Sequence, residues 1–278
     1  MNATFAFWSR FRTNRPAVAG LAVLGAVVAM AAVGPLLYPV DPFDMVGRPF
    51  QTPFGRYPLG TDVAGRDILA GLLHGARVSL LIGVMASLAA TVFGLAVGAV
   101  AGYYGGALDN ALMRFTDFFL TIPSFVLAVV LVAIFSPDIV NIVLAIAAVS
   151  WPSVARLARG EFIAHRNREY VLGCRALGMS DREILLFQIM PNALPPVIVV
   201  SSLTVATAIL TESGLSFLGL GDPNLVSWGY MIGVARTVLR SAWWMAAIPG
   251  LMILVTVLAI NLVGEGLNDA LNPRLRAR

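Results

Sequence analysis

The stretch "EYVLGCRALGMSDREILLFQIMP", from Glu169 to Pro191, places charged side chains, a glycine and a serine between two long apolar runs. Good helix formers fill its first half, and Gly178 then supplies the left-handed residue that commonly ends a helix. Ser180 stands three residues before Glu183 and ahead of an apolar run, which is the pattern of a capping box. The stretch therefore predicts a helix, a glycine turn and a second helix, with Pro191 breaking the second one.

The flanking runs belong to a chain of 278 residues that is 58% hydrophobic and 12% charged, with a mean hydropathy of +0.83. The charges are gathered in clusters, and long uncharged gaps separate them. A soluble domain of this length needs a charged surface that this composition does not supply. We therefore expect an all-α, polytopic integral membrane protein embedded in a lipid bilayer.

A helix that crosses the bilayer core needs about 20 mostly apolar residues. No small-residue cleavage site follows the first such segment, so we expect a retained helix rather than a signal peptide. The six predicted transmembrane segments are 17–38, 78–102, 118–135, 139–155, 195–217 and 242–264.

Six crossings place both ends of the chain on one side of the membrane. With the N-terminus in the cytoplasm, the positive-inside rule is obeyed, because more arginines lie inside than outside. The inside arginines are Arg10, Arg12, Arg15, Arg114, Arg156, Arg159, Arg166, Arg168, Arg175, Arg182, Arg274, Arg276 and Arg278, and the outside ones are Arg48, Arg56, Arg66, Arg77, Arg236 and Arg240.

This orientation gives the predicted organisation of the chain. It comprises a cytoplasmic segment 1–16, the first transmembrane helix in 17–39, an extracytoplasmic loop 40–77, a transmembrane domain 78–264 that includes the cytoplasmic loop 156–194, and a cytoplasmic tail 265–278. The outer segments 40–77 and 218–241 mix aromatic and turn residues, so both are candidate docking surfaces.

Several kinds of chemistry are excluded or disfavoured by the residues present. The chain has no lysine, so it holds neither a standard phosphate-binding P-loop nor a Schiff-base site. The single Cys174 rules out an internal disulfide, and two histidines, His74 and His165, leave little for a metal site. The net charge of +4 is explained by basic cytoplasmic loops and needs no nucleic acid.

The sequence Arg175-Ala176-Leu177-Gly178, followed by Ile189-Met190-Pro191-Asn192, resembles the cytoplasmic "EAA" loop of ABC importer permeases. The stretches "LGTDVAGRDILAGLLHGARVSLLIG" (59–83), "ESGLSFLGLG" (212–221) and "SWG" (227–229) are similar to the dipeptide, oligopeptide and nickel branch of that family. The resemblance implies a type I importer permease fold in the bacterial inner membrane. It also implies import of di- or oligopeptides, with nickel chelates or glutathione-like solutes as alternatives.

The resemblance further implies partners for this chain. They are a second homologous permease subunit, two ATP-binding subunits or domains that carry the ATP and magnesium, and an extracytoplasmic substrate-binding protein. This chain would itself hold no catalytic site and no cofactor, and the loop 168–191 would couple it to the ATPases. The implied coupling residues are Glu169, Leu172, Gly173, Cys174, Arg175, Ala176, Leu177, Gly178, Ser180, Asp181, Glu183 and Pro191.

The chain departs from the family pattern at one place. The Glu-Ala-Ala of the motif falls on Leu172-Gly173-Cys174, so the acidic residue is missing. Glu169 lies three residues earlier, on nearly the same helical face, and we hypothesise that it replaces the missing carboxylate. Cys174 is interpreted as a small helix residue, with a redox role as the alternative. From physics alone, an amphipathic loop on lipid headgroups remains an alternative for the whole stretch.

Two further groups of residues are candidates for docking or gating. Asp62, Arg66, Asp67 and Arg77 precede the second predicted span, where they would form a salt-bridge network, a contact with a substrate-delivering protein, or both. Glu212 is the only carboxylate at plausible membrane depth, which favours a structural or gating contact and leaves a substrate ligand as the alternative.

One further pattern bears on helix packing. Gly94, Gly98 and Gly102 form small-xxx-small steps that predict close packing of the second span against another helix.

Two other function classes fit the sequence less well. A secondary transporter needs its own coupling-ion site near the midplane, and Asn141, Asn261 and Glu212 are too sparse for one. An intramembrane hydrolase needs a nucleophile and a base within the bilayer, but both histidines fall at interfaces. Ser216 also lacks the second glycine of a G-x-S-x-G elbow. We therefore expect a transport subunit rather than an enzyme.

Overall fold

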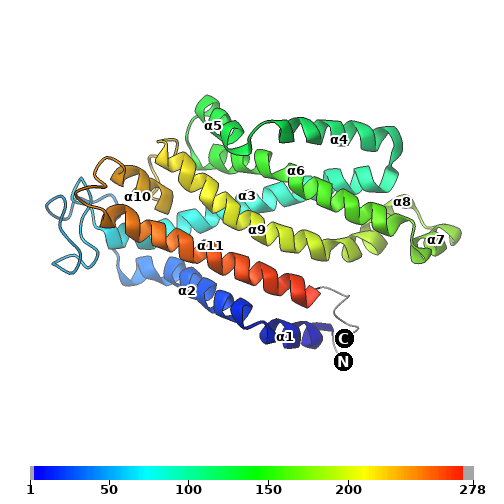
Figure 1. Ribbon diagram of the computed structural model, residues 1–278, viewed down its shortest axis with the longest axis horizontal. Coiled ribbons are helices and arrows are strands. Elements are labelled where there is room, and N and C mark those ends of the chain that lie inside the picture. Colours follow the sequence, from blue (N-terminus) through cyan, green and yellow to red (C-terminus); the bar gives the residue numbers. More distant parts are fainter. Residues whose placement is uncertain (1–2, 272–278) are drawn as a thin grey trace.

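The computed structural model describes residues 3–271, and its architecture is an elongated helical bundle (Figure 1). This confirms the expected all-α membrane fold. The elements are α1 (Ala3–Thr13), α2 (Arg15–Leu37), α3 (Ile68–Tyr104), α4 (Gly106–Thr121), α5 (Ser124–Phe135), α6 (Ile139–Arg166), α7 (Glu169–Ala176), α8 (Asp181–Glu183), the π-helical segment η1 (Ile184–Ile189), α9 (Met190–Phe217), α10 (Trp228–Ala235) and α11 (Trp244–Leu271).

Five helices in the described range are long and apolar enough to cross a membrane, namely α2, α3, α6, the continuous helix Asp181–Phe217 and α11. The sixth crossing is a bent pair, α4 and α5, whose axes differ by 87°. Counted in this way, the six predicted crossings are present. The bend falls at Ile122 and Pro123, where the backbone is extended, because proline lacks the N–H that would continue a helix.

The predicted boundaries of the third span, 118–135, were wrong. Helix α4 begins at Gly106, inside the segment expected to be a cytoplasmic loop. Its charged residues lower the hydropathy of this segment, so the sequence did not indicate a membrane helix there. Asp109 and Asp117 are each paired with an arginine of α6, so the neighbouring helix compensates their charge.

Three other helices are also longer than the sequence predicted. Helix α3 begins at Ile68, because the side chain of Asp67 accepts a hydrogen bond from the Leu69 N–H and caps the helix. Helix α6 continues to Arg166, and α11 continues to Leu271. The remainder of the predicted tail, 272–278, lies outside the described residues.

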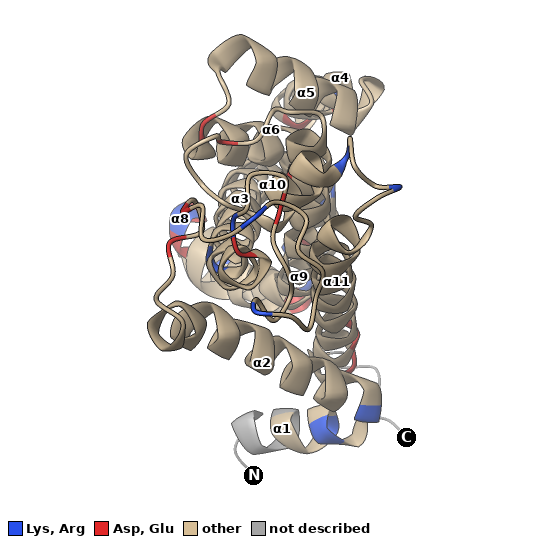
Figure 2. Cartoon of the chain, turned by 90° about the vertical axis from the view of Figure 1, so that its left-hand side faces the viewer, with Lys and Arg blue, Asp and Glu red and all other residues tan. Residues whose placement is uncertain are grey.

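The two ends of the bundle differ in what they carry. Figure 1 places α1, the last turn of α11 and the α7–α8 segment at one end, and the loop 38–67 and α10 at the other. We call these the handle end and the outer end. Figure 2 looks on to the outer end, where both positive and negative residues appear in the loop, while α5 is free of charge along its length.

Close contact between α3 and α6 confirms the packing predicted from the three spaced glycines. A Cβ atom at Gly98 would lie 2.3 Å from the carbonyl oxygen of Ala155, and one at Gly94 or Gly102 would lie 2.7 Å from the nearest carbonyl of α6. No larger residue fits these positions without moving the helices apart. The glycines therefore set the distance between the two helices.

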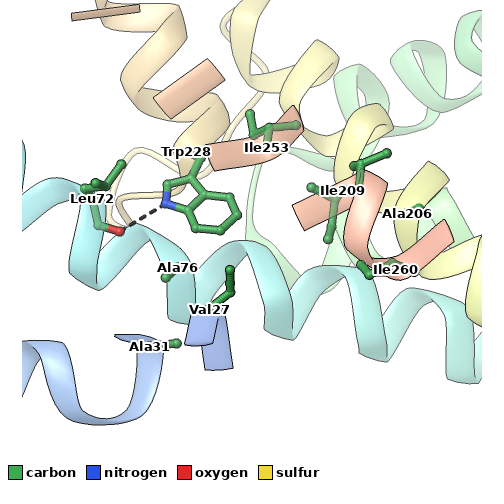
Figure 3. Packing of buried hydrophobic residues seen from close by; sticks show 10 residues of the cluster. Val27, Ala31, Leu72, Ala76, Ala206, Ile209, Trp228, Ile253 and Ile260 are labelled. Atoms are coloured by element: carbon green, nitrogen blue, oxygen red, sulfur yellow. Dashed lines mark hydrogen bonds between the residues drawn. The ribbon is translucent and has the colours of Figure 1, made fainter. Parts of the chain in front are cut away.

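Trp228 is the centre of the core at the outer end (Figure 3). Its indole is fully buried, and its Nε1–H donates to the carbonyl of Leu72, 3.0 Å away. Its backbone N–H donates to Ser79 Oγ at 3.1 Å. Because both acceptors belong to α3, the start of α10 is fixed against that helix, and side chains of α2, α9 and α11 close the cluster.

Candidate functional site

The handle, residues 168–191, has the local structure that its sequence predicts. Helix α7 ends at Ala176, and Gly178 adopts a φ of +76°, which is strained for any residue with a Cβ. Ser180 Oγ then accepts a hydrogen bond from the Glu183 N–H, and Glu183 Oε2 accepts from the Ser180 N–H at 2.9 Å. The predicted glycine turn and capping box are therefore both confirmed.

The predicted break at Pro191 was wrong, because the chain is helical without interruption from Asp181 to Phe217. The helix accommodates Pro191, which lacks an N–H, directly after the π-helical segment Ile184–Ile189, where the hydrogen-bond register shifts and the Met190 N–H donates to the Leu185 carbonyl. The side-chain amide of Asn192 donates to the Gln188 carbonyl at 2.7 Å and satisfies one of the backbone groups near this transition.

An apolar cluster fixes the handle to the rest of the bundle. Val171 of α7 and Ile184 and Ile189 of η1 are fully buried, and they pack with Phe162 of α6 and Tyr103 of α3. The second helix of the handle therefore has its apolar face in a protein core. The handle is a packed part of the membrane domain rather than a mobile loop.

Tyr103 is the site residue that sequence reasoning missed. Its hydroxyl donates to Asp181 Oδ1 at 2.6 Å, and the guanidinium of Arg175 lies 5.6 Å from the centre of its ring. Both contacts join the end of α3 to the handle. The available signal was a tyrosine pair, Tyr103-Tyr104, at the end of an apolar span, where amphipathic aromatic residues are enriched.

The surface of the handle that faces away from the bundle is exposed and carries both apolar and charged side chains. Glu169 and Leu172 lie one turn apart on α7, and both are exposed. Leu177 is 85% exposed in the turn, and Phe187 is 69% exposed on the second helix. Large exposed apolar side chains beside charged ones are typical of a protein interface. Cys174 is a free thiol, half-buried beneath this surface.

The remaining predicted handle residues are also exposed, although Arg175 and Asp181 contact Tyr103 as described above. They are Gly173, Arg175, Ala176, Gly178, Ser180, Asp181, Glu183 and Pro191.

The four charged residues ahead of the second predicted span do not form the salt-bridge network that the sequence predicted; they are Asp62, Arg66, Asp67 and Arg77. Asp62 accepts from the backbone N–H groups of Ala64 and Arg66, and Asp67 caps α3. Tyr38 donates to Asp67 Oδ2 at 2.5 Å, and this hydrogen bond to the carboxylate raises the pKa of Tyr38 to about 12. The carboxylates are therefore used to shape the loop, and no ion pair forms among the four predicted residues, all of which are described.

The two arginines of this cluster have different contacts. The guanidinium of Arg66 donates to the Tyr230 hydroxyl at 3.1 Å and lies 5.2 Å from the centre of the Phe43 ring, so it ties the loop to α10. Arg77 lies within α3, not before it, and is exposed.

Glu212 is 1% exposed and connects α9 to α10. Its Oε1 accepts from Ser216 Oγ at 2.7 Å and from Ser227 Oγ at 2.6 Å. Ser227 Oγ in turn accepts from the Tyr230 N–H and caps α10. The second carboxylate oxygen has no hydrogen-bond partner in the described structure. This arrangement fits the predicted structural contact, because the carboxylate holds the start of a neighbouring helix.

Comparison with known proteins places this geometry in a family. Residues 94–277 match the family described as binding-protein-dependent transport system inner membrane component. Residues 5–53 match the N-terminal TM domain of oligopeptide transport permease C.

Relatives and solved structures agree with these matches. The di/tripeptide transport system permease protein DppC of Pseudomonas aeruginosa is 40% identical over 97% of this chain and 92% of its own. The glutathione transport system permease protein GsiD of Pectobacterium atrosepticum is 38% identical over 98% of this chain and 91% of its own. An inward-facing MetNI methionine ABC transporter chain superposes with a TM-score of 0.60 at 19% identity, covering 72% of this chain and 96% of that one.

Proposed function

Because the chain belongs to the family of binding-protein-dependent transport system inner membrane components, we propose that it is the permease subunit of an ATP-driven importer of di- and oligopeptides. The observation that carries the peptide assignment is the 40% identity, over nearly the whole of both chains, to a di/tripeptide permease. Glutathione is the second candidate, because a glutathione permease is 38% identical over a similar length.

The handle is the proposed site of coupling to the ATPase subunits. Its exposed surface offers Leu172, Leu177 and Phe187 beside the carboxylate of Glu169, which supports insertion into a mixed apolar and basic groove. Its inner surface is packed against α3 and α6. Displacement of the handle by a partner would therefore be passed to the membrane helices.

The outer end is the proposed docking surface for the substrate-binding protein. Hydrogen bonds hold the loop 38–67 in one shape, including Thr61 Oγ1 to the Arg48 carbonyl at 2.6 Å and the Phe50 N–H to the Asp62 carbonyl at 3.2 Å. Phe54 is 95% exposed at a tight turn of this loop. A preorganised loop with an exposed aromatic side chain supports a protein contact, because little entropy is lost on binding.

The complete transporter would contain this chain, a second homologous permease subunit, two ATP-binding subunits or domains and a binding protein. ATP binding and hydrolysis would belong to the partners. The handle end and both termini would face the cytoplasm, in line with the distribution of arginines. The translocation path would lie between the two permease subunits and alternate between inward and outward access.

Reconstitution tests this proposal. The complex, co-purified with its binding protein and placed in proteoliposomes, is expected to accumulate a radiolabelled dipeptide only when ATP is enclosed on the handle side. Glutathione uptake without dipeptide uptake would transfer the assignment to the second candidate. Accumulation driven by an ion gradient without the ATPases would overturn the importer assignment.

A further inference from the structure

Helix α9 contacts several helices of the bundle, yet one of its faces is uncovered. It packs against α3, α6, α10 and α11. Ala208 and Leu215 face the cluster formed with α5 and α6, and Ser202 and Leu203 approach Gly264 of α11. The uncovered face lies between these two flanks, with α5 on one side and α11 on the other.

Three threonines mark this face. Thr204, Thr207 and Thr211 are spaced i, i+3 and i+7, so they lie on one side of the helix. Thr207 is exposed, and the other two are half-buried. Glu212, the one charged residue of α9, is buried and accepts a hydrogen bond from Ser227, which caps α10.

The uncovered faces of the neighbouring helices have a different composition. Helix α3 exposes Val84, Leu88 and Val92, and α11 exposes Leu251, Leu254 and Leu258. These are the side chains expected against lipid. The uncovered face of α9 also carries exposed apolar residues, Leu210 and Phe217, but three hydroxyls are added to it in one line. In membrane proteins polar side chains face a protein interior or a water-filled cavity.

The hydrogen bonds of the three hydroxyls decide what they can bind. Thr204 Oγ1 donates to the Val200 carbonyl at 3.0 Å, Thr207 Oγ1 to the Thr204 carbonyl at 3.0 Å, and Thr211 Oγ1 to the Thr207 carbonyl at 2.8 Å. A hydroxyl has one proton and two lone pairs, so each oxygen remains free as an acceptor. The face therefore offers a line of neutral acceptors and no free donor from these three side chains.

We propose that Thr204, Thr207 and Thr211 line the translocation path and accept hydrogen bonds from the amide N–H and ammonium groups of a passing peptide. This inference rests on the proposed importer function and adds the residues that contact the substrate. Neutral acceptors suit a path for peptides of differing side chains, because the backbone N–H groups are common to all of them. They also bind weakly enough to release the peptide, since a neutral hydrogen bond contributes only about 1 kcal/mol net.

Cysteine accessibility tests whether the face meets water. Cys174 is the only cysteine, so Cys174→Ala gives a thiol-free background on which Thr207→Cys is introduced. In the assembled transporter, a charged methanethiosulfonate is expected to modify Thr207→Cys at least about ten-fold faster than Val84→Cys or Leu254→Cys, because only a hydrated thiol ionises to the reactive thiolate. Adding peptide-loaded binding protein together with ATP should slow the modification of Thr207→Cys.

Equally slow modification of Thr207→Cys, Val84→Cys and Leu254→Cys would place the face against lipid and overturn the proposal. Slow modification with efficient cross-linking of Thr207→Cys to the second permease subunit would make it a subunit interface and also overturn it.

A second set of variants tests the acceptors. Replacing all three threonines with valine keeps their shape and removes the hydroxyls. Dipeptide uptake is expected to fall several-fold while the complex assembles and its ATPase still responds to the binding protein, and the triple serine variant should restore uptake. Unchanged uptake in the valine variant would refute the role in substrate contact. If dipeptide is not imported by the parent protein but Thr207→Cys is still hydrated, the path assignment stands and the peptide assignment fails.

Discussion

Tyr103, in the last turn of α3, donates its hydroxyl proton to Asp181, the first residue of α8, across 2.6 Å. The phenol ring is almost fully buried, and Arg175 of α7 lies over it. One side chain of the membrane domain therefore contacts both helices of the handle. The orientation of the handle is set by this contact together with the apolar cluster beneath it.

Replacing Tyr103 by phenylalanine should loosen the handle without unfolding the bundle. The ring still packs, but the hydrogen bond to a carboxylate is lost, which costs about 1–2 kcal/mol locally. Limited proteolysis at the exposed Leu177–Gly178 turn is expected to become several-fold faster. Tyr104→Phe is the matched control, because Tyr104 is exposed and has no such bond to the handle. Equal cleavage of the two variants would contradict the role of Tyr103.

The hypothesis that Glu169 replaces the missing acidic residue of the coupling loop gives a charge-reversal test. Glu169→Arg is expected to reduce ATPase activity stimulated by the binding protein several-fold, and Leu172→Ala is expected to reduce it less. Leu172 carries no charge, so its truncation removes only part of an exposed apolar contact. ATPase rates of the reconstituted complex provide the measurement. Equal effects, or the opposite order, would reject the hypothesis.

A methyl group at Gly98 should destabilise the bundle by about 1–3 kcal/mol, because it must displace the backbone of α6. Thermal unfolding of the detergent-solubilised complex is the measurement. Gly160→Ala is the control on the facing helix, since a Cβ at Gly160 meets nothing within 4 Å. That control should be neutral or gain up to about 1 kcal/mol from helix propensity. A stable Gly98→Ala variant would show that the helix contact is not set by this glycine.

The hydrogen bond between Tyr38 and Asp67 predicts a loss of stability in alkaline solution. The pKa of Tyr38 is raised from its ordinary value near 10 to about 12 in the folded protein. The raised pKa means that folding favours the protonated phenol. Its stabilising contribution is therefore complete below pH about 10 and is lost as the pH rises through about 12. Thermal unfolding between these pH values should show this loss in the parent protein and a shallower loss in Tyr38→Phe.

Ser227→Ala should weaken the outer end by about 1–2 kcal/mol, because it removes both the cap of α10 and a donor to Glu212. Ser241→Ala is the control in the same outer segment, where the hydroxyl bonds only to a carbonyl three residues earlier. Hydrogen exchange of the amides of residues 228–235 reports on the effect. Exchange that is unchanged in Ser227→Ala would contradict the role of Ser227 in holding α10.

The sequence predicted those parts of the fold that depend on local pattern. The capping box at Ser180 and Glu183 and the turn at Gly178 are local, and the structure contains them. The start of α4 was missed, because the ion pair of Asp109 with Arg159 joins residues far apart in the sequence. Contacts of that kind also include Tyr103 with Asp181, which no sequence spacing indicates.

The helix that begins at Asp181 and ends at Phe217 has a mechanical consequence. Its 37 residues span about 55 Å at 1.5 Å per residue, and no loop interrupts them. Its first turns form the second helix of the handle, and its other end carries Glu212, which holds α10. Because the helix is continuous, a displacement of the handle would be carried along it towards Glu212. The π-helical segment Ile184–Ile189 and the prolines Pro191, Pro195 and Pro196 are the places where the hydrogen-bond ladder is weakened and the helix can bend or twist.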